Sequence, residues 1–261
     1  MDQTPPFAVI TGGSRGIGAQ YARALAAQGY DLLLVARDRT QLETLKHELH
    51  RVPQRKIWTE SLDLSQSRAA ETLHDLARSY RSEVSLLINN AGFGLYGDFA
   101  EMPLANIQNM LQLHMNTIVE SIRLFLPDML ARKQGAIVTV ASVAGFFPIP
   151  YITEYAATKA FLITFSEGLA RETQNQGVTI QVCCPGFTDT DFHQSAGHQP
   201  KHVFFAQTPQ QVVQASLQAL QSKHTLVTIG WQGLLASWTS KIIPQAILMA
   251  IAGKAVKPPS I

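Results

Sequence analysis

The chain has 261 residues, of which 46% are hydrophobic and 15% are charged, and its formal net charge is +2. This length and apolar content allow a large buried core without disulfides or a structural metal, and they argue against an intrinsically disordered chain. The near-neutral charge gives no electrostatic footprint for nucleic acid, so we expect no nucleic-acid partner.

Short apolar runs and helical patterns alternate through the first half of the chain. The apolar runs predict strands at residues 7–10, 32–35, 57–59 and 86–88. Apolar residues at helical spacing predict helices at about 17–28, 42–49 and 67–80. Each of the first three strands is therefore expected to be followed by a helix.

The second half repeats this alternation. Strands are predicted at 136–140, 178–183 and 226–229, and helices at about 104–130, 153–174 and 209–220. The two cysteines, Cys183 and Cys184, are adjacent and read as strand residues, which rules out a disulfide framework and favours a reducing compartment. Because residues 1–4 lack the basic and apolar pattern of a signal peptide, we expect a cytoplasmic protein.

The predicted strands are apolar throughout instead of alternating between apolar and polar residues. Such strands are buried on both faces, as in a parallel sheet covered by helices on each side. Regular alternation of strand and helix predicts a doubly wound α/β fold of the Rossmann type. No linker, repeat or low-complexity segment divides the chain, so we expect a single domain over residues 1–261.

A glycine-rich segment, Thr11-Gly12-Gly13-Ser14-Arg15-Gly16-Ile17-Gly18, separates the first strand from the first helix. Glycines let the backbone approach a pyrophosphate closely, and the helix N-terminus supplies free N–H groups and a partial positive charge. The strand–loop–helix context predicts a dinucleotide site. Its expected contacts are Gly12, Ser14, Arg15, Gly16, Ile17 and Gly18. The alternative is a tight turn that needs glycine for its geometry alone.

The end of the second strand indicates which cofactor is bound. NAD-binding folds usually place an acidic residue here, where it accepts hydrogen bonds from the ribose hydroxyls. This chain has Ala36 at that position, followed by Arg37, and Arg15 projects from the glycine loop. Two guanidinium groups suit a phosphate, so we predict NADP(H). In the alternative interpretation Asp38 accepts from the ribose and the arginines are solvated.

A tyrosine and a lysine stand four residues apart in a predicted helix, as Tyr155 and Lys159. Residues at this spacing share a helix face, and an ammonium group near a phenol lowers the phenol pKa from its usual value of about 10. Such a tyrosine is a usable general acid or base. Ser142, just after the strand at 136–140, is placed to hold a carbonyl oxygen beside it.

With these residues in place, the sequence resembles the short, one-domain branch of the short-chain dehydrogenase/reductase family over about residues 7–190. The resemblance rests on the glycine segment, Asp63, Asn89-Asn90-Ala91-Gly92, Asn116, Ser142, Tyr155 to Lys159, Pro185-Gly186 and Thr190. It implies a seven-stranded sheet with the order 3-2-1-4-5-6-7. It also implies a homodimer or homotetramer assembled through the long helices.

The resemblance implies a role for each matching residue. Tyr155 donates a proton to the carbonyl oxygen, Ser142 steadies that oxygen, and Lys159 lowers the tyrosine pKa and binds the nicotinamide ribose. Asn116 holds a water that links Lys159 to solvent. Further cofactor contacts are implied for Asp63 at the adenine, for Asn90, Ala91 and Gly92 at the strand-four turn, and for Pro185, Gly186, Thr188 and Thr190 near the nicotinamide. Simpler roles remain open, since Asn116 could bend its helix, Asp63 could cap one and Asn90 could be a turn residue.

Two segments are expected to line the substrate crevice beyond the strand ends. Residues 143–150 are apolar, which favours a hydrophobic substrate, although ordinary loop packing explains them nearly as well. Residues 188–207 are polar and predict a substrate lid loop. The histidines of that loop, His193, His198 and His202, lack the spacing of a metal site, so we expect no metal.

The segment 230–261 is an apolar C-terminal extension. Its longest nearly apolar run, residues 242–252, is too short for a membrane span of about 20 residues. Trp231 and Trp238 and three lysines give it aromatic and basic flanks, so it could cover the crevice, meet another subunit or lie on a membrane surface. We favour packing within the molecule or between subunits over membrane contact.

The leading hypothesis is an NADPH-dependent reductase of a ketone or aldehyde, with the reverse alcohol oxidation at the same site. Two alternatives remain. One is a protein that binds NADP(H) as a sensor without catalysis, since function depends on sites and not on folds. The other is a ketoreductase for fatty-acyl or steroid substrates at a membrane surface, which the extension could touch. Residues 155–192 resemble the branch of the family that includes broad ketone reductases and fatty-acyl or steroid-acting members.

Overall fold

Seven parallel strands form one sheet in the computed structural model, which describes residues 4–50, 55–190, 192 and 206–256. The strands are β1 (Phe7–Thr11), β2 (Asp31–Ala36), β3 (Ile57–Ser61), β4 (Leu86–Asn89), β5 (Gly135–Val140), β6 (Val178–Cys184) and β7 (Leu226–Thr228). Their order is β3-β2-β1-β4-β5-β6-β7, as the family resemblance implies. Ile10 pairs with Leu34 on one side and with Ile88 on the other, which places β1 between β2 and β4.

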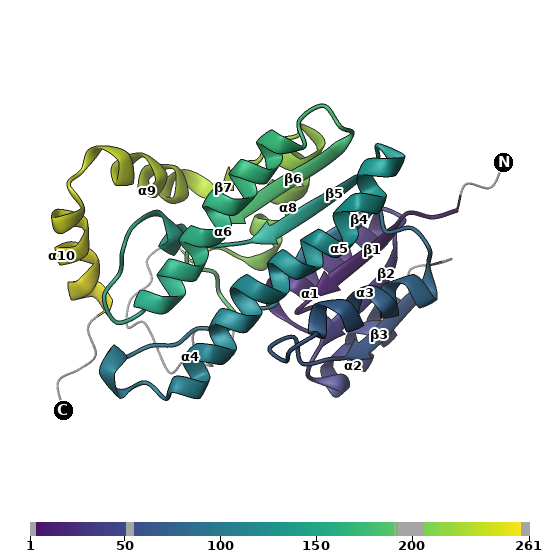
Figure 1. Cartoon of the computed structure of the whole chain (residues 1–261), viewed down its shortest axis with the longest axis horizontal. Helices are drawn as coiled ribbons and strands as arrows, with labels where there is room; N and C mark the ends of the chain where they lie inside the picture. The colour runs from purple at the N-terminus through teal and green to yellow at the C-terminus, as the bar shows by residue number, and fades with distance from the viewer. Residues whose placement is uncertain (1–3, 51–54, 191, 193–205, 257–261) are drawn as a thin grey trace.

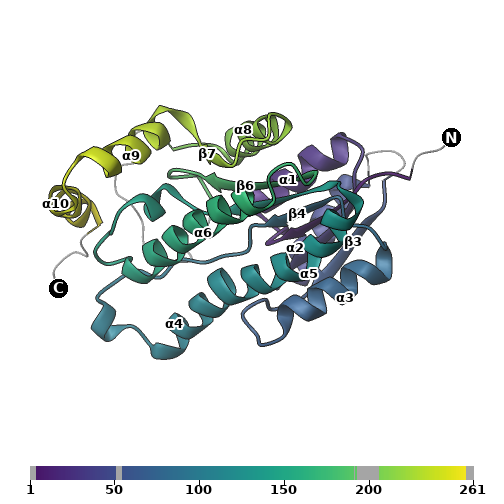
Figure 2. The same cartoon turned by 45° about the horizontal axis from the view of Figure 1, so that its top comes forward.

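Helices cover both faces of the sheet (Figures 1 and 2). They are α1 (Gly16–Ala27), α2 (Arg39–Leu49), α3 (Ala69–Tyr80), α4 (Leu104–Leu111), α5 (Thr117–Arg132), α6 (Thr153–Glu172), α8 (Pro209–Gln221), α9 (Gly230–Ile242) and α10 (Gln245–Val256). Alternate residues of β1 enter opposite cores: Ile10 packs with α1, α2 and α8, whereas Val9 packs with α3, α5 and α6. The continuously apolar strands are thus buried on both faces, as expected.

The long helix predicted at 104–130 is interrupted. The structure has α4, then a π-helical turn at Gln112–Asn116, then α5, which continues to Arg132 with Pro127 inside it. Apolar periodicity does not distinguish these segments, because a π turn changes the hydrogen-bond spacing without requiring glycine or proline. The prediction of one regular helix was therefore wrong at this turn.

The C-terminal extension forms two helices. The strand predicted to reach residue 229 ends at Thr228, and α9 begins at Gly230, whose φ is +68°. Both α9 and α10 lie at one end of the molecule, beyond α8 and the start of α6 (Figures 1 and 2). Of the helices in the described part of the chain, none combines the length and apolarity needed to cross a membrane.

A buried chain of hydrogen bonds joins the two halves of the sequence. The Tyr21 hydroxyl in α1 donates to Ser216 Oγ in α8 at 2.6 Å, and Ser216 Oγ donates to Gln181 Oε1 in β6 at 2.6 Å. Gln181 Nε2 donates back to the Ser216 carbonyl at 3.1 Å. These side chains satisfy one another inside the apolar core, which avoids the cost of unpaired buried polar groups.

Candidate active site

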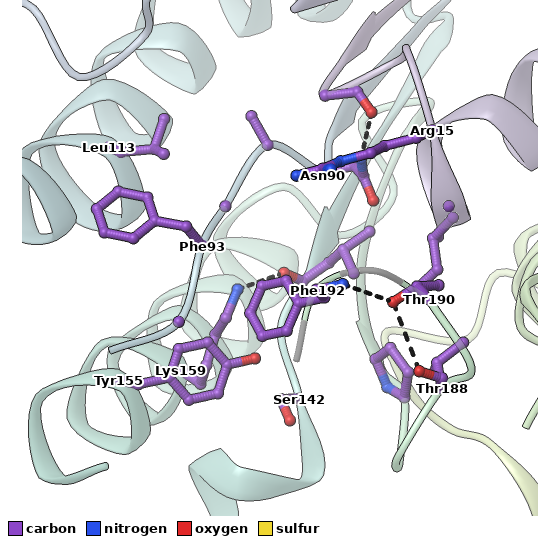
Figure 3. Close-up of a pocket in the computed structure, with 18 of the residues that line it drawn as sticks. Arg15, Asn90, Phe93, Leu113, Ser142, Tyr155, Lys159, Thr188, Thr190 and Phe192 are labelled. Carbon is purple, nitrogen blue, oxygen red and sulfur yellow. Dashed lines mark hydrogen bonds between the residues drawn. The ribbon is translucent and has the colours of Figure 1, made fainter. Parts of the chain in front are cut away.

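A cavity of about 980 Å³ opens at the carboxyl ends of the strands, where open α/β sheets bind their ligands. Figure 3 shows Ser142, Tyr155 and Lys159 in one part of this cavity, and Arg15 and Asn90 in another. The predicted site residues that line it are Gly12, Ser14, Arg15, Gly16, Ile17, Arg37, Asp63, Asn90, Ala91, Gly92, Ser142, Tyr155, Lys159, Pro185, Gly186, Thr188 and Thr190. Two predicted residues, Gly18 and Asn116, are not part of its lining.

Close backbone contacts require glycine in the loop after β1. A Cβ at Gly18 would lie 2.1 Å from the Gly12 carbonyl oxygen, and Gly12 itself has a φ of +64°. The Asn90 side-chain amide donates to the carbonyls of Thr11 and Gly12 at 3.0 and 3.1 Å. Gly18 thus allows the close backbone approach within the loop. Asn90 lines the cavity and also holds the loop through these two hydrogen bonds.

The hydroxyl of Thr11 connects β1 to the turn after β4, a role that the sequence interpretation missed. Its oxygen accepts from the backbone N–H groups of Asn90 and Ala91 at 3.0 and 3.1 Å, and it donates to the Ile88 carbonyl at 3.2 Å. A polar residue ending an otherwise apolar strand was the available signal. Thr11 therefore holds the turn after β1 and the turn after β4 together.

The charged residues after β2 and β3 lie near one another at the cavity. Asp38, the alternative ribose acceptor, caps α2 by accepting from the Gln41 N–H at 3.0 Å. Burial by itself would raise the pKa of Asp63, but hydrogen bonds from Ser65 and Gln66 and the charge of Arg37 outweigh it, so the pKa is lowered. Asp63 is thus an ionised acceptor in a turn, and it does not cap the following helix, because the N-cap position of α3 is Arg68.

The catalytic candidates come from the end of β5 and from α6. Tyr155 and Lys159 share one face of α6, and the Lys159 Nζ donates to the Val140 carbonyl at 2.9 Å. That Nζ lies 5.5 Å from the centre of the Tyr155 ring. Ser142 Oγ accepts from the Ala144 N–H at 3.1 Å, which fixes the serine at the start of the short helical turn Val143–Phe146.

The expected lowering of the Tyr155 pKa by Lys159 is not seen. Burial raises the pKa of Tyr155 to about 12, and the nearby Ser142 hydroxyl opposes this only in part. The lysine ammonium is directed to the Val140 carbonyl instead of to the phenol oxygen, and its own burial lowers the pKa of Lys159 to about 8. At neutral pH the tyrosine is therefore a protonated hydroxyl, which is the form that donates a proton.

A buried histidine, His114, connects three parts of the site and was not predicted from the sequence. Its Nε2 accepts from the Phe93 N–H at 3.1 Å, so its Nδ1 carries the proton toward Thr158 Oγ1, 3.1 Å away. Thr158 in turn donates to the Tyr155 carbonyl at 2.8 Å. Burial, followed by the charge of Lys159, holds the pKa of His114 well below its ordinary value. A neutral imidazole thus links the turn after β4 to the helix that carries Tyr155.

Asn116 ends the π turn and is exposed to solvent. Its side-chain amide donates to Gln112 Oε1 at 2.9 Å, within the same turn. The structure therefore does not bring Asn116 to the cavity wall. Asn116 lies instead at the end of the π turn that interrupts its helix. A water relay through Asn116 stays a prediction.

The segment after β6 is anchored by Gln207, a third residue that the sequence interpretation missed. Gln207 Oε1 accepts from the Gly186 N–H at 3.1 Å, and its Nε2 donates to the Ile229 carbonyl at 2.6 Å. Backbone bonds also join Asp189 and Phe187 to Gln207. The predicted lid, residues 188–207, is thus fixed at both ends. Its residues 191 and 193–205, including His193, His198 and His202, lie outside the described part.

The apolar part of the cavity is built differently from the expectation. From the predicted segment 143–150 only Val143 and Ala144 reach the cavity, because Phe146 and Phe147 pack against core clusters. The apolar lining is completed by Phe93, Leu95, Tyr96, Leu113, Ile152, Phe187 and Phe192. Across the described chain, no cluster of three His, Cys, Asp or Glu side chains is arranged to hold a metal ion.

Comparison with known proteins gives matches over most of the chain. A family model described as short chain dehydrogenase matches residues 6–201. The very-long-chain 3-oxoacyl-CoA reductase of Phaeosphaeria nodorum is 36% identical over 179 residues, which are 67% of this chain and 52% of that protein. The ketoacyl reductase HetN of Nostoc sp. is 31% identical over 240 residues, which are 90% of this chain and 82% of that protein. The chain thus spans about half the length of the first relative and most of the second.

Solved structures share the fold closely. A short-chain dehydrogenase from Sphingobium yanoikuyae in complex with NADPH aligns with a TM-score of 0.84 and 28% identity, covering 94% of this chain and 95% of the other. A short chain dehydrogenase/reductase from Burkholderia phymatum in complex with NAD aligns with a TM-score of 0.82 and 22% identity, covering 100% of both chains. At that lower identity the second likeness speaks only for the fold.

Proposed function

The chain belongs to the short-chain dehydrogenase/reductase family, and on that premise we propose that it uses NADPH to reduce the carbonyl group of a hydrophobic ketone or aldehyde. The same site would carry out the reverse alcohol oxidation. The observation that carries the proposal is the protonated Tyr155 at the wall of one cavity with Ser142 and Lys159. A purely non-catalytic sensor would have no use for this arrangement.

The residues present fit a nicotinamide dinucleotide. The glycine loop leaves no space for side chains at Gly12 and Gly18, and it leads into the N-terminus of α1, where N–H groups and the helix dipole favour a pyrophosphate. The cofactor, when bound, supplies or accepts the hydride. Ser14, Gly16 and Ile17 would hold its phosphates, and Pro185, Gly186, Thr188 and Thr190 line the same cavity.

The chain's own chemistry is orientation and proton delivery. The Ser142 hydroxyl would donate a hydrogen bond to a substrate carbonyl oxygen while its oxygen accepts from Ala144. Tyr155 holds a proton at its phenol oxygen and passes it to the same carbonyl oxygen as negative charge develops there. The positive charge of Lys159 stabilises that negative charge strongly, because the lysine is buried in a poorly solvated interior.

Tyr155→Phe tests the assignment directly. It should lower kcat/KM for NADPH-dependent ketone reduction by about 10²–10⁴-fold, the usual contribution of a general acid, while leaving NADPH binding in place. Tyr151→Phe is the matched control, because Tyr151 is close in sequence but does not line the cavity. Undiminished turnover in Tyr155→Phe would refute the mechanism. NADPH binding without turnover across a broad carbonyl panel would favour the sensor instead.

We propose NADP(H) as the preferred cofactor because Arg15 and Arg37 line the cavity and Ala36 occupies the position of the usual ribose acceptor. Asp38 supports this choice, since its carboxylate already caps α2. Arg37→Ala should weaken NADPH binding by at least about tenfold, the loss of a charge-assisted phosphate contact, and leave NADH binding nearly unchanged. Arg39→Ala, at the exposed start of α2, is the control. A proportionate loss for both cofactors would contradict the assignment.

A 3-oxoacyl thioester is the first substrate class to test. The cavity is lined by aromatic and aliphatic side chains, and both relatives above are named as oxoacyl or ketoacyl reductases. Thioesters of increasing chain length, together with steroid and simple aromatic ketones, should be ranked by kcat/KM. Assembly as a homodimer or homotetramer stays a prediction that light scattering can check, and the exposed Leu104 and Leu111 of α4 support it.

A further inference from the structure

One face of α9 exposes a continuous apolar stripe. Trp231, Leu234, Leu235, Trp238 and Ile242 fall at spacings of three and four residues, so they share one side of the helix. The two tryptophans are 63% and 66% exposed, and Ile242 is 74% exposed. The opposite side of α9 is packed, since Gly233 and Ser237 are buried. We call these five exposed residues the α9 stripe. Such a contiguous apolar surface marks an interaction site.

The adjoining helix α10 adds an exposed apolar side chain to this surface and packs against the segment after Ser142. Ile247 is 52% exposed, whereas Leu248 is buried. Ala252 packs against the cluster that contains Ile149 and Ala156, and a Cβ at Gly253 would lie 3.2 Å from Pro150. The loop after Ser142 therefore supports α10. No residue of the extension is among those that line the cavity, so coverage of the crevice stays a prediction, while the side chains of the α9 stripe are exposed.

The charge of the C-terminal part is one-sided. All 19 acidic residues lie before position 192, whereas residues 192–261 contain five lysines and no Asp or Glu. Three of those lysines, Lys241, Lys254 and Lys257, belong to the extension itself. The net charge of the whole chain is therefore small although its C-terminal part is basic. The α9 stripe lies in that basic part.

We propose that α9 and α10 dock on the surface of an anionic lipid bilayer, with the α9 stripe inserted among the headgroups and upper acyl chains. Exposed tryptophans beside aliphatic side chains and lysines are the chemistry of helices that lie in a membrane interface. A symmetric contact between two copies would join two basic ends, since residues 192–261 contain five lysines and no acidic residue to compensate them. An anionic bilayer offers both an apolar phase and opposite charge.

Docking in this way would bring the segment between Ser142 and α6, in which Val143 and Ala144 line the cavity, toward the lipid surface. Because α10 packs on Pro150, the segment between Ser142 and α6 faces the same boundary as the extension. A hydrophobic substrate dissolved in the bilayer would then reach the cavity over a short path. This consequence depends on the proposed substrate class, whereas the docking itself does not.

Vesicle co-sedimentation of the full chain tests the proposal. The protein should pellet with vesicles of phosphatidylcholine mixed with phosphatidylglycerol, and much less with phosphatidylcholine alone. Added salt should weaken the binding, because it screens the lysine–lipid attraction. The intrinsic fluorescence should shift to the blue on binding, since two of the three tryptophans lie in the α9 stripe and the third, Trp58, is packed between Phe7 and Tyr80.

The double variant Trp231→Ser/Trp238→Ser removes the aromatic part of the stripe without touching the core. It should reduce partitioning into anionic vesicles by at least about tenfold, given the apolar area lost, and abolish the fluorescence shift. Phe99→Ser is the matched control, because Phe99 is 60% exposed but lies outside the extension. Ketone reduction in vesicle-free buffer should be the same in all three proteins, which separates failure of docking from failure of the proposed chemistry.

Three outcomes would overturn the proposal. Equal, negligible pelleting of the native chain with both kinds of vesicle would remove the membrane as partner. An equal loss in Phe99→Ser would remove the α9 stripe as the docking surface. A change from a larger to a smaller oligomer in the double variant, seen by light scattering without vesicles, would assign the stripe to a contact between copies.

Discussion

At the scale of single residues, burial governs the protonation of the groups around the cavity. Burial raises the pKa of Tyr155 to about 12, so the phenol keeps its proton. Burial lowers the pKa of Lys159 to about 8, so its ammonium group loses a proton more readily than that of an exposed lysine. His114 stays neutral, since both burial and the lysine charge oppose its protonation. At neutral pH the site therefore contains one proton donor, one buried positive charge and one uncharged imidazole.

The pH dependence of reduction should follow Lys159. We expect kcat/KM for ketone reduction to be level through neutral pH and to fall above a pH of about 8, because the lysine then loses the charge that stabilises the developing oxyanion. Tyr155 stays protonated through this range, so it does not produce the fall. Initial rates across pH give the profile. Lys159→Met should abolish the fall at a much lower rate, and a level native profile up to pH 10 would contradict the assignment.

His114 should make the stability of the folded chain depend on pH in the acidic range. Its folded-state pKa is lowered, so below its ordinary value of 6.5 the unfolded chain binds a proton that the folded chain refuses. Stability is therefore fully present above pH 6.5 and is lost as the pH falls below it. Thermal unfolding from pH 7.5 to 5 should show a smaller fall in His114→Gln than in the native chain. His224→Gln, at an exposed position, should behave like the native chain, and identical falls in all three would exclude His114 as the cause.

The site residues predicted from the sequence belong to local patterns, whereas the residues that were missed act through long-range contacts. Tyr155, Lys159 and the loop glycines form local patterns, and one helix or one turn explains their spacing. Thr11, His114 and Gln207 act through bonds to residues at least about twenty positions away, which no local pattern records. The wrong direction for the tyrosine pKa has a similar origin, because burial and the Val140 carbonyl are tertiary features.

At the scale of secondary-structure elements, buried strands were the most predictable. Continuous apolar runs located all seven strands of the observed sheet to within a few residues, since burial on both faces leaves little choice of side chain. The helix over 104–130 was less predictable, because its apolar spacing does not mark the π turn, in which His114 contacts Thr158 of α6. The aromatic residues after β5 were misplaced, because apolar character alone does not separate a cavity wall from a core.

The turn from β1 into α1 should not tolerate a methyl group. Gly18→Ala would place a Cβ 2.1 Å from the Gly12 carbonyl oxygen, so the loop must shift. We expect a loss of about 1–3 kcal/mol in unfolding free energy, as for overpacked sites, together with weaker NADPH binding. Urea unfolding and cofactor titration measure the two effects.

Gly168→Ala in α6 is the control for that substitution. Among the described residues, a Cβ at Gly168 would meet no heavy atom within 4 Å outside its own chain neighbours and helix backbone, and alanine is the better helix former. This variant should gain about 0.5–1 kcal/mol and bind cofactor normally. If both glycine variants behaved alike, the close contact at Gly18 would not be what constrains the loop.

At the scale of the whole molecule, we propose that residues 4–256 unfold as one cooperative unit. The sheet is continuous, and the chain Tyr21–Ser216–Gln181 joins α1 to α8 and β6 across most of the sequence. Tyr21→Phe keeps the ring but removes one buried hydrogen bond, which should cost about 1 kcal/mol. Calorimetry should show a single transition at a lower Tm. Two separated transitions, or no change in Tm, would contradict a joint core held by this network.

The π turn at Gln112–Asn116 has a geometric consequence for the surface of the molecule. A π turn holds one residue more than an α-helical turn, so it acts as a one-residue insertion in an otherwise α-helical run. Each residue of an α-helix advances the helix by about 100° around its axis. Deleting one residue here would therefore change the helical phase between α4 and α5. The outward direction of Leu104 and Leu111 on α4 thus depends on a single inserted residue beside the active site.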